Sequence, residues 1–220
     1  HNLAEAGLQT DADRAALFTF GSKRVTYEWA DVRGHEGTHN GEYLIGDKPA
    51  MVHGPEVGFL RNVGPNSAVI TYSANFQALE DGLSPWVKPG SLWVARDAFV
   101  RKQLAALNRP YVIAGYVWFQ GIDDGLLHRG QDRYQSDLEQ IAADMKLTYG
   151  DARFVIVREI DSQIAGSYYM TPIRAAQVEV GSQPGNASVD VDGLPLVDIH
   201  HITSAGQLEA GSRIAEAMRK

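Results

Sequence analysis

The chain has 220 residues, of which 44% are hydrophobic and 21% are charged, a composition typical of one folded domain and not of a disordered segment. It contains no cysteine, which excludes a disulfide scaffold, a thiolate metal site and a cysteine nucleophile. The formal net charge of -7 disfavours nucleic-acid binding, and no apolar run approaches the ~20 residues of a membrane span.

Residues 1–50 show little apolar periodicity. After a helical start between Leu3 and Leu17, we interpret them as an irregular excursion through the Gly- and His-rich run from Arg33 to Glu42. No charged region followed by an apolar stretch marks a signal peptide after His1. Because the chain lacks an initiator methionine, we expect the gene product to begin upstream of His1.

Residues 51–220 alternate between strand patterns and helix patterns. Short β-prone runs predict strands at Ser67–Tyr72, Tyr111–Trp118 and Phe154–Val157, the last two buried on both faces. Helical spacing and end signals predict helices at Pro55–Arg61, Leu92–Leu107, Tyr134–Met145 and Gly206–Met218. This alternation predicts a single α/β domain over residues 1–220, with a parallel sheet covered on both faces.

The clearest chemical signal is Asp198-Ile-His-His201 before the last helix. A carboxylate three residues before a histidine can accept from one ring nitrogen while the other nitrogen faces a substrate, as a catalytic base requires. The structural alternative is that Asp198 caps a turn, that His200 and His201 are solvated, and that Ser204 caps the last helix.

A second signal lies where the strand ending at Trp118 gives way to a loop. Gln120 offers an amide donor and Gly121 permits close backbone approach, so together they could hold an oxyanion. The structural alternative is an ordinary turn in which Asp123 or Asp124 is the N-cap of a short helix.

Two further groups of polar residues give weaker signals. His53 and Glu56 could line a cleft, although Pro55 and Glu56 suit the first turn of a helix. The carboxylates of Asp123 and Asp124 with the two histidines at 200 and 201 could form an oxygen and nitrogen metal site. Their spacing matches no ligand motif, so we predict neither a metal nor a cofactor.

Four blocks of the sequence form a recognisable set when taken in order. They are His53-Gly-Pro-Glu-Val-Gly-Phe59, Val117-Trp-Phe-Gln-Gly-x-x-Asp124, Val189-Asp-Val-Asp-Gly-Leu-Pro-Leu196, and Asp198-x-x-His201 followed by Gly206-Gln207 and Gly211-x-Arg213. Together they resemble the sialate O-acetylesterase and acetylxylan esterase-like carbohydrate esterases, a branch of the SGNH (GDSL-like) hydrolases. The resemblance runs from about Met51 to Arg219.

This resemblance implies a flavodoxin-like three-layer sandwich with a central parallel sheet, the SGNH hydrolase fold. It implies an acetylesterase that frees sugars or polysaccharides of acetyl groups through a serine acyl-enzyme, with Asp198 and His201 as the acid and base of the triad. Gln120 and Gly121 would help to build the oxyanion hole, and Asn75 falls in a block that usually supplies a backbone donor. An acetylated carbohydrate substrate suggests a secreted or periplasmic protein.

The sequence does not contain the serine motif that supplies the nucleophile in the family it resembles. Family members carry Gly-Gln-Ser-Asn at the end of a first strand that lies between the second and third strands, and no such run occurs here. Without that strand, each buried unpaired peptide group would cost about 1–3 kcal/mol. We therefore expect a strand with a serine upstream of His1. Ser73 ends a predicted strand and is the candidate within the chain, but it lies in no Gly-x-Ser-x-Gly elbow and reads as a turn serine.

The alternative function is a non-catalytic relative of the same fold that binds glycans or serves as a structural module. Asn75 and Ile122 replace a glycine and an acidic residue that the family usually has. Five aromatic residues could stack on sugar rings, namely Trp86, Trp93, Trp118, Tyr168 and Tyr169.

Overall fold

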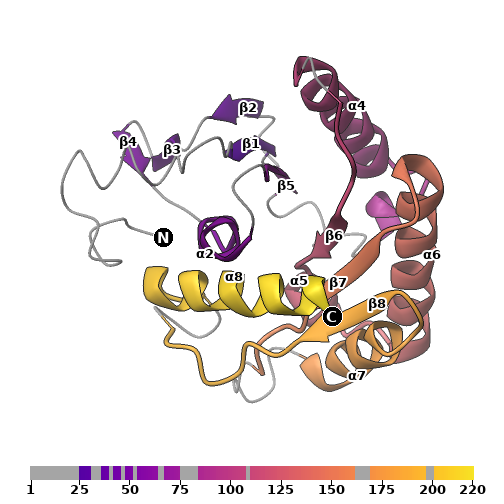
Figure 1. Cartoon of the computed structure of the whole chain (residues 1–220). Coiled ribbons are helices and arrows are strands. Elements are labelled where there is room, and N and C mark those ends of the chain that lie inside the picture. The colour runs from indigo at the N-terminus through magenta and orange to yellow at the C-terminus, as the bar shows by residue number, and fades with distance from the viewer. Residues whose placement is uncertain are drawn as a thin grey trace.

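The structure is a computed structural model. It describes residues 25–30, 36–39, 42–45, 48–51, 54–63, 67–74, 84–107, 110–161, 169–196 and 201–220, and for residues 25–51 it describes the backbone alone. In chain order (Figure 1) the elements are β1 (Val25–Ala30), β2 (Glu36–His39), β3 (Glu42–Ile45), β4 (Lys48–Met51), α2 (Glu56–Asn62), β5 (Val69–Ala74), η1 (Ser84–Trp86), α4 (Ser91–Ala106), β6 (Gly115–Trp118), α5 (Ile122–Leu126), α6 (Gln131–Tyr149), β7 (Arg153–Val157), α7 (Met170–Gly181), β8 (Asn186–Val189) and α8 (Ser204–Arg219).

A parallel sheet of β6, β7 and β8 forms the middle layer of the fold. Side chains of β7 alternate between its two faces, as the geometry of a strand requires. Phe154 and Ile156 enter a core shared with α6 and α7. Val155 and Val157 enter a second core shared with α8. These four side chains are fully buried, so the three-layer α/β sandwich predicted from the sequence is confirmed.

A second sheet joins β2, β1 and β5. β1 runs parallel to β5 over six residue pairs and antiparallel to β2, while β3 and β4 form an antiparallel pair. The prediction that residues 1–50 are irregular is therefore wrong for these four strands. Val25-Thr-Tyr-Glu-Trp-Ala30 is rich in β-prone residues, and its pairing with β5 satisfies its backbone groups. The helical start predicted between Leu3 and Leu17 lies outside the described residues.

The four predicted helices are confirmed as α2, α4, α6 and α8, with two corrections to their caps. α8 is capped by Thr203, whose hydroxyl accepts from the backbone N–H of Gly206, and Ser204 is the first residue of the helix. The short helix α5 begins after Gly121, so Asp123 and Asp124 lie inside its first turn and are not its N-cap.

β6 is shorter than the predicted strand Tyr111–Trp118 and is not buried on both faces. Tyr111 is 51% exposed and Val112 is 88% exposed, and Val117 within the strand is also exposed. Among the described residues β6 pairs with β7, β5 pairs with β1, and no ladder joins β5 to β6. A run that the sequence marks as a strand therefore reaches the surface at the edge of the sheet that faces away from β7.

Two glycines let α2 and α8 cross at backbone contact, with α2 seen end-on above α8 in Figure 1. A Cβ atom at Gly58 would lie 2.0 Å from the carbonyl oxygen of Leu208. A Cβ atom at Gly211 would lie 2.0 Å from the carbonyl oxygen of Pro55. The pattern Gly211-x-Arg213 in the sequence thus marks a helix crossing that no larger residue permits.

Candidate active site

Loops after β6, β7 and β8 lie at the carboxyl edge of the parallel sheet, and among the described candidate residues Gln120, Gly121 and His201 belong to these loops. The direction of α8 supports this placement. Arg153 at the start of β7 donates to the carbonyl oxygen of Ala217 near the end of α8, at 3.0 Å. The amino end of α8, which His201 precedes by three residues, therefore points toward the opposite edge, where the strands end.

The side chain of Gln120 is engaged inside the turn that follows β6. Its Nε2 donates to Oδ2 of Asp124 at 2.7 Å, and Asp124 is fully buried. The Nε of Arg129 lies 3.0 Å from the other oxygen of Asp124. Gln120 Oε1 is buried without a hydrogen-bond partner among the described residues. In this arrangement the Gln120 amide stabilises the turn, and the donors left for an oxyanion are the backbone N–H groups of the turn.

The backbone of the same turn is fixed by two buried polar side chains. The carbonyl oxygen of Gln120 accepts from the hydroxyl of Tyr134 at 2.6 Å and from Nε2 of Gln177 at 3.0 Å. Gln177 also donates to the Tyr134 hydroxyl at 3.1 Å. A Cβ atom at Gly121 would lie within 3 Å of the side chains of Glu159, Gln177 and Ile173. The absence of a side chain at Gly121 therefore lets the turn pack directly against β7's following loop and α7.

Glu159 is the residue at this edge that the sequence analysis missed. It lies two residues after β7, is only 9% exposed, and accepts a hydrogen bond from the backbone N–H of Ile122. Burial raises the pKa of the Glu159 carboxyl to about 7, and burial also raises the pKa of Asp123. An acidic residue directly after a buried strand was the one sequence signal that could have identified it.

The loop that carries His201 is closed by main-chain contacts. Leu196 and Ile202 form an antiparallel bridge, and the N–H of Thr203 donates to the carbonyl oxygen of Pro195 at 2.8 Å. Ile202 is buried, whereas the neighbouring His201 is exposed. The part of the loop next to α8 is thus fixed by main-chain contacts, and the side chain of His201 is exposed to solvent there. Asp198 and His200 lie outside the described residues.

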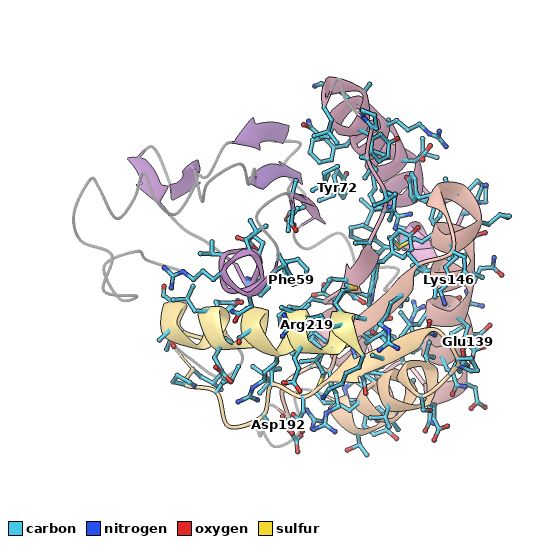
Figure 2. The ribbon with its side chains drawn as sticks, viewed as in Figure 1. Phe59, Tyr72, Glu139, Lys146, Asp192 and Arg219 are labelled. Carbon is cyan, nitrogen blue, oxygen red and sulfur yellow. The ribbon has the colours of Figure 1, made fainter. Side chains whose placement is uncertain are left out.

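Two arginines hold the segment between β8 and this loop against the end of β7. Arg174 makes a bidentate contact with Asp192, with N···O distances of 2.9 and 2.5 Å. It also donates to the carbonyl oxygen of Glu159. Arg158 donates to Asp192 at 3.0 Å and to Asp190. The hydrogen bond from Arg174 holds the pKa of Asp192 below its usual value. The acidic residues of the Val189–Leu196 block, among them Asp192 (Figure 2), are therefore structural.

The remaining predicted site residues fall into three groups. Ser73 lies in β5 with its backbone opposite Trp29 of β1, and its side chain is not among those described. Asn75 and His53 lie outside the described residues. Glu56 is buried and accepts from the N–H of Gly54 at 2.7 Å, as a residue in the first helical turn does. Within the described residues, no three His, Asp or Glu side chains gather as metal ligands would.

The proposed sugar-stacking aromatics are mostly core residues. Trp86, Trp93 and Trp118 are at most 7% exposed. Trp86 packs edge-on against Trp118, with ring centroids 5.3 Å apart. Tyr169 is exposed and stacks with His128, and Tyr168 lies outside the described residues. The three tryptophans therefore offer no free ring to a sugar.

The fold and the polar turns at its carboxyl edge define a three-layer α/β protein of the kind that carries its chemistry in loops after parallel strands. Residues 81–220, more than half of the chain, match the family described as carbohydrate esterase, sialic acid-specific acetylesterase. The chain belongs to this family, as the resemblance predicted.

A solved structure supports the same fold. An X-ray structure of a protein from Arabidopsis thaliana is similar over 88% of this chain and 80% of its own, with a TM-score of 0.62 and 19% sequence identity. No curated protein matches the chain significantly. A search of the described helices finds none long and apolar enough to cross a membrane.

Proposed function

We propose that the protein is a serine-type carbohydrate O-acetylesterase, which removes acetyl groups from sugars or polysaccharides through an acyl-enzyme. The observation that carries the proposal is the family match over residues 81–220. It is supported by the placement of the Gln120–Gly121 turn and the His201 loop at the same edge of the sheet. An acetylated polysaccharide is met mostly outside the cytoplasm, so we also propose a secreted or periplasmic location.

The chemistry of the proposal needs three groups. His201 takes the proton of a serine hydroxyl as the oxygen attacks the acetyl carbonyl, and then gives it to the departing sugar oxygen. Asp198 fixes the tautomer of His201 and stabilises the imidazolium. The negative oxygen formed in each step accepts from backbone N–H groups, for which we propose the turn at Gly121. A water activated by His201 then releases acetate and restores the serine.

The nucleophile is proposed to lie on a further strand that fills the space between β5 and β6. Tyr72 of β5 (Figure 2) packs on Trp86 with ring centroids 5.9 Å apart, and Trp86 packs on Trp118 of β6, so both strands border one core. No ladder joins β5 to β6 in the described part of the chain. The exposed apolar residues before β6, Tyr111 and Val112, are what an added neighbouring strand would cover.

Release of acetate tests this function. The protein in its natural full length is incubated with an acetylated sugar, and acetate is measured with and without a chelator such as EDTA. We expect turnover that the chelator leaves unchanged, because a serine mechanism uses no metal ion. Loss of activity with EDTA would favour the metal-dependent alternative. Binding of the sugar without acetate release would favour the non-catalytic relative.

A further inference from the structure

Glu159 lies directly beneath the backbone of the proposed oxyanion turn. Its Cγ atom would be 2.8 Å from a Cβ atom at Gly121, so the glycine backbone rests on the glutamate side chain. The Ile122 N–H donates to the Glu159 carboxylate. The turn after β6 is thus joined to the end of β7 through one buried acid.

The backbone of Glu159 is itself held at both polar groups. Its N–H donates to Oε1 of Gln177 at 2.9 Å, and its carbonyl oxygen accepts from Arg174. Gln177 is the same side chain that donates to the carbonyl oxygen of Gln120. The position of the glutamate relative to the turn is therefore fixed from α7, and the carboxylate has little freedom to move away.

A negative charge at this place requires an explanation other than stability. Asp123 and Asp124 of α5 repel a charged carboxylate here, and Arg174 of α7 attracts it. A neutral glutamine could accept the same N–H bond without being an ion removed from water. Acids whose pKa is shifted by burial and by neighbouring charges cluster at functional sites.

We propose that Glu159 is a positioning residue, whose carboxylate holds the peptide of Ile122 and thereby orients the N–H groups of Gln120 and Gly121 toward the reacting carbonyl. This inference rests on the proposed esterase function and adds a residue to its oxyanion site. A charged acceptor forms a stronger hydrogen bond than a neutral one. The turn is accordingly held most firmly when Glu159 is ionised, and least firmly when it is protonated.

The protonation of Glu159 makes both stability and activity depend on pH. Because the pKa of Glu159 is raised in the folded protein to about 7, the folded state binds this proton more tightly than the unfolded state. Stability contributed by the protonated form is complete below the unfolded pKa and is lost as pH rises through about 7. The proposed role in catalysis has the opposite trend, since the ionised form orients the turn. Stability and activity should therefore respond to this proton in opposite directions.

The Glu159→Gln variant tests whether the negative charge of Glu159 contributes to catalysis. The variant keeps a neutral acceptor, so its kcat should match that of the wild type below about pH 6. Above about pH 8 its kcat should be about five- to tenfold lower than that of the wild type, with KM unchanged. Taking the ratio of the two kcat values at each pH removes every effect that the two proteins share. Asp161→Asn, a nearby exposed carboxylate, is the matched control and should keep a constant ratio. A ratio for Glu159→Gln that is independent of pH would overturn the positioning role.

An NMR titration gives a readout that does not depend on turnover. In 15N-labelled wild-type protein, the Ile122 amide signal should shift with a midpoint near 7, and in Glu159→Gln this titration should disappear. In Asp123→Asn the titration should persist with a lower midpoint, because a repelling charge is removed. An Ile122 titration that survives in Glu159→Gln would overturn the proposal. If the protein releases no acetate at all, the esterase function fails, while the titration still decides whether Glu159 holds the turn.

Discussion

Replacing His201 with alanine is expected to lower kcat for acetyl-ester hydrolysis roughly 10^4-fold or more. The serine then has no base to take its proton, and the departing sugar oxygen has no acid to protonate it. What remains is the catalysis that bound substrate and oxyanion donors supply by themselves. The measurement is steady-state acetate release, with circular dichroism and the thermal midpoint recorded to show that the variant is folded. His201 is exposed, so its replacement should leave the midpoint nearly unchanged.

The matched control is His128, an exposed histidine in the turn between α5 and α6. Its backbone has a positive φ of 51°, so asparagine, which tolerates this conformation, is the suitable replacement. His128→Asn should retain kcat within about twofold, because no step of the proposed mechanism uses this residue. Turnover by His201→Ala at the wild-type rate would remove His201 from the mechanism and leave the esterase assignment to another base.

Replacing Gly211 with alanine is expected to destabilise the protein by about 2–4 kcal/mol, because overpacking forces the backbone to shift. The added Cβ atom would lie 2.0 Å from the carbonyl oxygen of Pro55 and 2.4 Å from the nitrogen of Phe59. Both are main-chain atoms, so no side chain can rotate away and α2 must move from α8. Urea denaturation measures the change as a lower midpoint with an unchanged slope.

Two comparisons make the test of this helix crossing specific. Gly130→Ala adds a methyl group where no heavy atom lies within 4 Å, and it should cost less than about 1 kcal/mol. Gly58→Ala strains the same crossing from the other helix, so the double variant with Gly211→Ala should lose less stability than the sum of the two single changes. Strict additivity, or an unchanged midpoint for Gly211→Ala, would contradict a backbone contact between α2 and α8.

Elements with strong apolar periodicity could be predicted from the sequence. Tyr134, Leu138 and Ile141 repeat at helical spacing, and all three are fully buried in α6. Phe154–Val157 forms a continuous apolar run and lies in the buried strand β7. These patterns are local, because the face that each side chain buries is fixed by its position along the helix or strand.

Elements defined by their partners could not be predicted. β8 consists of Asn186-Ala-Ser-Val189, a run that reads as a turn and becomes a strand through its parallel pairing with β7. α7 carries Pro172 in its first turn, and the sequence analysis made no prediction there. For such segments, tertiary packing overrides the weak local preference.

The candidate site divides in the same way. Gln120 and Gly121 could be identified because they follow the apolar run that ends at Trp118, where loops of parallel sheets carry function. For Glu159 the sequence offers only its position just after a buried strand, because its contact with Ile122 joins loops after two different strands. The pairing of Gln120 with Asp124 was also hidden, although the two are only four residues apart, because the sequence does not tell whether a side chain turns inward or outward.

Trapping of an acetyl-enzyme is the measurement that most directly tests the account. The protein in its natural full length is mixed with p-nitrophenyl acetate, quenched in acid during turnover and examined by peptide mass spectrometry. We expect a serine peptide heavier by about 42 Da, the mass of one acetyl group, whose modification disappears once substrate is consumed. Steady ester hydrolysis with no transient acetyl-serine would contradict the mechanism, and so would an acetyl group that never turns over.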